Sequence, residues 1–237
     1  MAGFKLKVRA NANDVKEQAG GEWINKSGVF PITINFLSLS KSDNGAVSYA
    51  INYNYKDNDS TIYGPTIMNK DGSENEIGYR TLNKLFNIAG LDDGYEPETT
   101  EETHRVGKDN KEQSFQVLAD LSDLEVQMKT KLEYGKYKGD IKERMNIDSF
   151  FRMDGASADE LIMLNGGSEI QVGKQLEKIL ANPKTTEYKL GKDENKVAVT
   201  QAEVDAYLAA KSSGNSTTSN QQAAPAVVKP AKNLFAN

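Results

Sequence analysis

The sequence predicts an α+β fold that is mainly β, with antiparallel strands and added helices, and two observations carry this prediction. Residues 27–68 contain three runs rich in β-branched and aromatic residues, separated by turn signals. Apolar residues then recur at helical spacing between residues 78 and 90 and again in the last third of the chain. A length of 237 residues with 38% hydrophobic residues suits one medium-sized domain with additions.

The first three predicted strands follow one another along the chain. The first is "SGVFPITINFLSLS" (27–40), and "KSDNG" after it is a turn signal. In "AVSYAINYNYKD" apolar and polar residues alternate strictly, so one face of the second strand carries Val47, Tyr49, Ile51, Tyr53 and Tyr55. The third strand is "TIYGPTIM", in which Pro65 indicates a sheet edge or a bulge.

The hydrophobic period changes in "GYRTLNKLFNIAGLDD". Its apolar residues have helical spacing and Gly90 ends the run, so we expect a helix. An acidic loop is expected between residues 92 and 103, and "SFQVLADLSDL" is interpreted as a short helix. Strands return in "LEVQMKTKLEY" and "DIKERMNIDSFF".

The last third of the chain is expected to form small packing helices. "SADELIML" and "TQAEVDAYLAAK" each begin with a capping pattern, and "VGKQLEKILANP" is amphipathic. From residue 212 a Ser, Asn, Gln, Ala and Pro tract cannot bury a core, so we expect disorder. The predicted organisation is a basic N-terminal segment (1–20), a β-rich domain (21–153), an accessory helical subregion (154–211) and a tail (212–237).

The composition excludes several kinds of chemistry. The chain has no cysteine, and its single histidine, His104, lies in a turn-rich acidic stretch where we expect a solvated loop. Thiolate metal sites and cysteine nucleophiles are excluded, and a histidine metal cluster or a Ser-His-Asp triad is disfavoured. "NGGSEIQVGK" fails the spacing of a phosphate-binding loop, because Lys174 is followed by Gln175. We predict no catalytic residue, no metal and no cofactor, with a metal nuclease as the weaker alternative.

The chain lacks the sequence signs of a membrane protein. No apolar run approaches the roughly 20 residues of a membrane span. The first residues also lack the apolar middle of a signal peptide. We therefore expect a cytoplasmic protein with no membrane partner.

Positive charge concentrates in "KTKLEYGKYKGDIKERMNIDSFFR" (129–152), which has seven basic and four acidic residues in a chain of net charge -5. We expect a hairpin that turns through "GKYK" and pairs Leu132 with Ile141. This register places Lys131 opposite Lys142 and Lys129 opposite Arg144. Like charges that face each other across a ladder cost stability, and an anionic partner would relieve that cost.

Single-stranded nucleic acid is the expected partner, because cations neutralise phosphates and aromatic rings stack on unpaired bases. The predicted phosphate contacts are Lys129, Lys131, Lys136, Lys138, Lys142 and Arg144. The predicted stacking residues are Tyr134, Tyr137, Phe150, Tyr53 and Tyr55. Two alternatives stay open: a solvated lysine-rich strand face that prevents edge-to-edge pairing, and core positions for about half of these rings.

Three strands, a helix and two strands is the element order of the OB-fold, a small barrel that binds oligonucleotides. The runs that include "AVSYAINYNY", "LNKLFNIAG" and "YGKYKG" resemble the single-stranded-DNA-binding and related replication or recombination proteins of lytic bacteriophages, over about residues 20–165. The resemblance implies an OB-like five-stranded barrel, with a helix between strands 3 and 4, that holds single-stranded DNA in the host-cell cytoplasm. It also implies a C-terminal tail that recruits replication, recombination or transcription proteins.

Within that tail, Leu234 and Phe235 would bind the partner protein. Tails of this family are usually acidic, whereas the residues after Lys211 contain no carboxylate, so the acidic tract at 92–102 becomes the candidate autoinhibitory element. The sequence thus predicts a non-enzymatic single-stranded-DNA-binding protein, with DNA or RNA preference and homo-oligomerisation left open. The alternative is a protein-interaction module or transcription cofactor with no nucleic-acid affinity.

Overall fold

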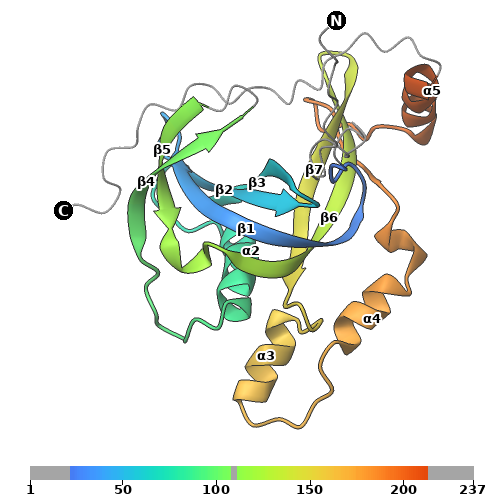
Figure 1. The fold of residues 1–237 in the computed structure, drawn as a ribbon. Helices are drawn as coiled ribbons and strands as arrows, with labels where there is room; N and C mark the ends of the chain where they lie inside the picture. The colour runs from blue at the N-terminus through green and yellow to red at the C-terminus, as the bar shows by residue number, and fades with distance from the viewer. Residues whose placement is uncertain (1–21, 108–110, 213–237) are drawn as a thin grey trace, which may run out of the picture.

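The computed structural model describes residues 22–107 and 111–212. The predicted basic segment (1–20) and almost all of the predicted tail, with Leu234 and Phe235, lie outside the described residues. The described chain is an α+β structure built on an eight-stranded, mainly antiparallel sheet (Figure 1). No helix in the described ranges is long and apolar enough to cross a membrane.

The strands of the sheet are β1 Gly28–Lys41, β2 Val47–Tyr55, β3 Asn58–Met68, β4 Thr99–Val106, β5 Lys111–Leu118, β6 Leu124–Tyr137, β7 Asp140–Phe151 and β8 Lys189–Leu190. The helices are α2 Glu76–Ile88, α3 Ala158–Asn165, α4 Lys174–Leu180 and α5 Gln201–Ser212, with short 3-10 turns η1 Ala119–Leu121 and η2 Pro183–Thr185. The strand order is β3-β2-β1-β5-β4, and β6 pairs with the first half of β1 and carries β7 and β8.

The inner face of the β1–β2–β3 meander forms the core, as the alternation in β2 predicts. Tyr49, Ile51 and Tyr53 are buried there with apolar residues of β1 and β6. Helix α2 covers this core with Leu82 and Leu85, and the side chain of Asn75 caps its N-terminus by accepting a hydrogen bond from the Gly78 amide. The predicted first three strands and the helix are confirmed.

Strands β4 and β5 pair in antiparallel fashion, so the acidic loop ends at residue 98 and the short helix predicted from residue 114 is wrong. Only η1 is helical in that stretch. Threonines in β4, with Phe115 and Val117 in β5, favour extended backbone, and β5 also pairs with β1. His104 is therefore not a solvated loop residue, because its ring stacks on Phe36 with centroids 3.8 Å apart.

The sheet does not close into the expected five-stranded barrel. Strand β3 contacts β7, but no ladder of backbone hydrogen bonds joins these two strands in the described chain. The predicted order of three strands, a helix and two strands is present, with the β4–β5 hairpin inserted before β6. The α+β class and the predominance of β-structure are confirmed.

The C-terminal helices pack in two places, and their predicted caps are present. Ser157 and Glu160 form a capping box at α3, and the buried Glu160 carboxylate also accepts hydrogen bonds from the amides of Gly173 and Gln175. Burial opposes ionisation of Glu160, but these backbone hydrogen bonds lower its pKa. Helix α5 instead packs on the β6–β7 hairpin, through a small second cluster of Tyr134, Val199 and Val204.

Candidate functional site

The β6–β7 hairpin projects from the sheet as a two-stranded arm, with α5 beside it (Figure 1). Its strands are joined at the tip by Lys138 and Gly139, which both have positive φ angles, 51° and 88°. Positive φ at both central positions is the backbone of a two-residue type I′ turn, which matches the twist of the strands. The predicted four-residue loop "GKYK" is therefore wrong.

The tighter turn changes the register of the arm. Leu132 lies opposite Met145, not Ile141, which is an offset of four residues. Lys131 consequently faces Asn146, and Glu133 faces Arg144. The predicted like-charge pairs, Lys131 with Lys142 and Lys129 with Arg144, do not form, so the stability cost inferred from them is absent.

Along most of the arm, the side chains that were predicted to share one face nevertheless do so. Between Thr130 and the turn the offset of four residues is even, and side chains alternate with a period of two, so no residue there changes face. Ladder pairs place three basic side chains on one face, together with Glu133, Tyr137 and Asp140. The three are Lys131, Lys142 and Arg144. We call Lys131, Lys142 and Arg144, together with Lys189 beside Glu133, the basic face of the arm.

Several of the predicted phosphate-binding cations have partners within the chain. Lys129 pairs with Asp148 at 2.5 Å, and Lys142 lies 3.6 Å from Asp140. Lys131 donates a hydrogen bond of 2.6 Å to the Lys184 carbonyl oxygen. The side chains of Lys142 and Asp140 are 59% and 75% exposed, so water competes strongly with their ion pair.

Lys136 lies on the opposite face of the arm, under α5. Its ammonium donates to the Glu203 carboxylate at 2.8 Å, and this hydrogen bond raises the pKa of Lys136. The same bond, with hydrogen bonds from the amide and hydroxyl of Thr200, lowers the pKa of Glu203 to about 2. Lys136 therefore holds α5 against the arm, and its predicted role as a phosphate contact stays a prediction.

Most of the predicted stacking residues are inside the protein. Tyr134 is 4% exposed and makes edge contacts with Tyr188 and Tyr207 in the cluster under α5. Burial, followed by the charge of Glu143, raises the pKa of Tyr134 to about 12. Phe150 and Tyr53 are buried in the main core, and Tyr55 packs edge-on against Phe30. These side chains are core residues, which is the alternative that the sequence left open.

Tyr137 is the predicted stacking residue that is largely exposed. It lies next to the turn at the tip of the arm and is 54% exposed. The Lys138 ammonium lies 5.3 Å from the centroid of its ring, which is a cation–π contact. An accessible ring with an adjacent cation is suited to stacking on a nucleobase whose phosphate is near the lysine.

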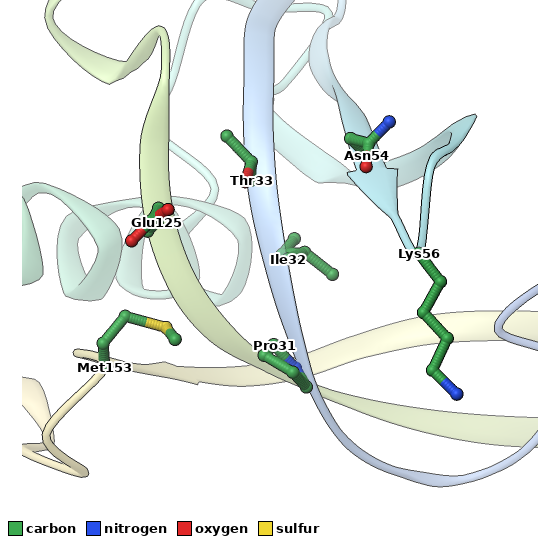
Figure 2. Close-up of a pocket in the computed structure, with 7 residues that line it drawn as sticks. All are labelled: Pro31, Ile32, Thr33, Asn54, Lys56, Glu125 and Met153. Carbon is green, nitrogen blue, oxygen red and sulfur yellow. The ribbon is translucent and has the colours of Figure 1, made fainter. Parts of the chain in front are cut away.

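A second feature, which the sequence prediction missed, is a shallow recess on the outer face of the sheet. It has a volume of about 170 Å³ and is lined by Pro31, Ile32, Thr33, Asn54, Lys56, Glu125 and Met153. Thr33 lies between Asn54 and Glu125 on the neighbouring strands, as Figure 2 shows. The signal in the sequence was the polar half of the β2 alternation, since Asn54 lies on the face of the strand opposite to Tyr53.

The acidic tract lies at the other side of the sheet from the arm (Figure 1). Its loop is attached to the sheet through Asp120, which accepts hydrogen bonds from the Tyr95 hydroxyl at 3.1 Å and the Glu98 amide at 3.0 Å. This tract is therefore placed away from the basic face, and the structure gives no support to its suggested autoinhibitory role.

Within residues 22–107 and 111–212, no group of three or more histidine, aspartate or glutamate side chains is arranged to hold a metal ion. No protein-family model matches the chain, and no curated protein matches its sequence.

Proposed function

We propose that the protein is a non-enzymatic single-stranded-DNA-binding protein of the kind that acts in phage replication, recombination or transcription. The observation that carries this proposal is the exposed Tyr137 at the tip of the arm, on the same face as Lys131, Lys142 and Arg144. An accessible ring beside a row of cations fits a flexible strand, whose phosphates and bases alternate.

The strand arrangement supports an OB-like interpretation. A β1–β2–β3 meander is followed by α2, and β6 then returns to the edge of β1 that β2 leaves unpaired. Strand β7 follows β6 and contacts β3, where a barrel of this type would close. In this interpretation the β4–β5 hairpin is an insertion, and the arm is the extended connection between the fourth and fifth strands.

The basic face would bind the sugar-phosphate backbone by exchanging exposed ion pairs for phosphates. Exposed pairs contribute only about 0–1 kcal/mol each, so a phosphate can replace Asp140 beside Lys142 at little cost. Lys131, Lys142, Arg144 and Lys189 are the proposed phosphate contacts. Tyr137 would stack on a base, with Lys138 neutralising the adjoining phosphate.

The recess on the outer face of the sheet would hold a nucleotide that has passed the arm. Thr33 and Asn54 offer hydrogen-bonding groups to a base or sugar. Asn54 already donates to Asp59 at 3.0 Å, which orients its amide. Glu125 at the rim disfavours a phosphate there, so a base is the better occupant than the backbone.

Fluorescence anisotropy of labelled oligo-dT, duplex DNA and RNA at low and high salt tests the proposal. Binding of oligo-dT should weaken with salt, with a log-log slope of roughly -0.7 for each phosphate neutralised. The variant Lys142→Glu/Arg144→Glu should lose most of this affinity and show a shallower salt slope. The matched control Lys174→Glu/Lys178→Glu reverses two exposed charges on α4, away from the arm, and should bind as the wild type does.

A second candidate function is a protein-interaction module with no intrinsic affinity for nucleic acid. The observation that favours it is the ion pairing of Lys129 with Asp148 and of Lys136 with Glu203, which leaves fewer cations for phosphates than the sequence indicated. This candidate predicts no binding of oligo-dT even at low salt. The same titration therefore separates the two functions.

A further inference from the structure

Strand β4 lies at a free edge of the sheet (Figure 1). It is the last strand in the order β3-β2-β1-β5-β4, and within residues 22–107 and 111–212 only β5 forms a ladder with it. In an antiparallel pair every second residue directs its N–H and C=O away from the partner strand, so β4 presents backbone donors and acceptors along its free edge. The ladder has no bulge and the sequence, "TTEETHRV", has no proline or lysine, so β4 lacks three features that commonly block edge-to-edge pairing.

The charged residues of β4 are ordered along the strand. Glu101 and Glu102 come first, and His104 and Arg105 follow. Glu101 and Arg105 are exposed on one face of the strand, together with Thr103. Glu102 and His104 are partly buried on the other face. On each face a carboxylate therefore precedes a basic side chain, and this order is complementary to a copy of the strand that runs in the opposite direction.

We propose that β4 pairs with β4 of a second copy of this chain, antiparallel and around a two-fold axis at Thr103. An axis perpendicular to the sheet keeps opposite residues on the same face of the joined sheets. Glu101 then lies opposite Arg105 of the second copy, and Glu102 lies opposite its His104. Thr103 meets its own counterpart, and threonine pairs of this kind are favourable cross-strand neighbours. By symmetry each of the two charged contacts occurs twice.

A shift of the axis by one residue removes this complementarity. An axis at Glu102 would place that carboxylate opposite its own counterpart, which is unfavourable. An axis at His104 would place Glu102 opposite Val106 and Arg105 opposite Thr103, so no carboxylate would lie opposite a basic side chain. The sequence of β4 therefore favours the register that is centred on Thr103.

The contacts of β4 within its own chain are compatible with this pairing. Arg105 forms an exposed ion pair with Glu112 of β5 at 2.8 Å. In the joined sheets Arg105 would lie between Glu112 on one side and Glu101 of the second copy on the other. A guanidinium group has five N–H donors, which suffice for two carboxylates. The arginine would thus link the ladder within the chain to the ladder between the chains.

Sedimentation equilibrium of the full chain without nucleic acid tests this inference, which does not depend on DNA binding. One pair of edge strands is smaller than the interface of a permanent dimer, so the average mass should rise with concentration from monomer towards dimer. The variant Glu101→Arg places two arginines opposite each other, and Arg105→Glu places two carboxylates opposite each other. Each variant alone should weaken dimerisation at least about tenfold. The control Glu177→Arg makes the same charge change on an exposed position of α4 and should dimerise as the wild type does.

A mixture of the two variants separates the interface from effects within one chain. In a dimer of Glu101→Arg with Arg105→Glu, both contacts on the exposed face again join opposite charges, so the equimolar mixture should recover the dimer. Mixing cannot repair the ion pair with Glu112 that Arg105→Glu loses within its own chain. The inference is overturned by a wild type that stays monomeric at every concentration, by a dimer that Glu101→Arg leaves intact, or by a mixture that dimerises no better than its components.

Discussion

The hydroxyl group of Tyr49 provides a direct test of the packing inside the sheet. Tyr49 is 1% exposed, and its ring lies against Gly64, where an added Cβ atom would come within 2.2 Å of it. Among the residues that the structure describes, its hydroxyl has no hydrogen-bond partner. Tyr53, two residues further on the same face of β2, is also buried, but its hydroxyl is hydrogen-bonded to Ser60. The two tyrosines therefore form a matched pair.

The variants Tyr49→Phe and Tyr53→Phe should change stability in opposite directions. An unpaired buried hydroxyl costs about 1–3 kcal/mol in desolvation, and its removal leaves a void of only one oxygen atom, so Tyr49→Phe should stabilise the protein by about 1 kcal/mol. Tyr53→Phe breaks a hydrogen bond worth about 1 kcal/mol and should destabilise by that amount. The variants would then differ by about 2 kcal/mol, roughly a thirtyfold difference in the unfolding equilibrium constant.

Urea denaturation followed by circular dichroism measures both variants. The midpoints should move in opposite directions with an unchanged m value, and the melting temperature should shift by about 2–4 °C per kcal/mol in a chain of this length. If Tyr49→Phe lowers the free energy of unfolding as much as Tyr53→Phe does, the Tyr49 hydroxyl is hydrogen-bonded in the folded protein. The reasoning from its missing partner would then be refuted.

Three further predictions concern the helix on the core and the arm. Gly78→Ala should lower the free energy of unfolding in urea by about 3 kcal/mol or more, because its Cβ atom would lie 1.9 Å from the Thr66 carbonyl oxygen. Gly90→Ala should lower it by about 1–2 kcal/mol, because position 90 has open space around it but a φ of +78°. Glu203 has a pKa of about 2 in the folded protein, below its usual value of 4.5, so its stabilisation of α5 should be present above pH 4.5 and lost as the pH falls towards 2. Faster amide exchange in α5 at low pH should show this loss. In the variant Glu203→Gln, exchange in α5 should no longer depend on pH over this range. Tyr134 has a folded pKa of about 12 against a usual 10, so its contribution to stability should be fully present below pH 10 and be lost as the pH rises through 12. Tyr134→Phe should reduce that alkaline loss in the circular dichroism signal.

The parts of the fold that the sequence predicted are those fixed by local periodicity. Strict alternation in β2 identified the buried side of Tyr49, Ile51 and Tyr53 without knowledge of any partner strand. The caps of α3 and α5 were also visible, because Ser157 with Glu160 and Thr200 with Glu203 are only three residues apart. Such patterns act within a few residues and need no tertiary information.

The elements that prediction missed depend on contacts between distant residues. Strand β4 is polar and charged because it lies at an edge, so it lacks the apolar alternation of a half-buried strand. The register of the arm depended on whether the chain turned at Lys138–Gly139 or through a longer loop, and this choice moved the pairs between Thr130 and Tyr137 by four residues. The ion pair of Lys136 joins residues 67 positions apart, which no local pattern indicates.

The C-terminal helix accounts for the way in which the arm keeps one face open. A two-stranded ribbon is at best marginally stable in water unless one of its faces is buried. Leu132, Tyr134 and Ile141 provide that apolar face, and α5 covers it with Val204 and two neighbouring side chains, Tyr207 and Leu208. The ion pairs of Lys136 with Glu203 and of Lys211 with Glu143 add to this contact from both strands. Because the helix occupies the apolar face, Lys131, Lys142 and Arg144 remain together on the other face. Helix α5 is thus a structural part of the proposed binding arm, although none of its residues needs to touch the DNA.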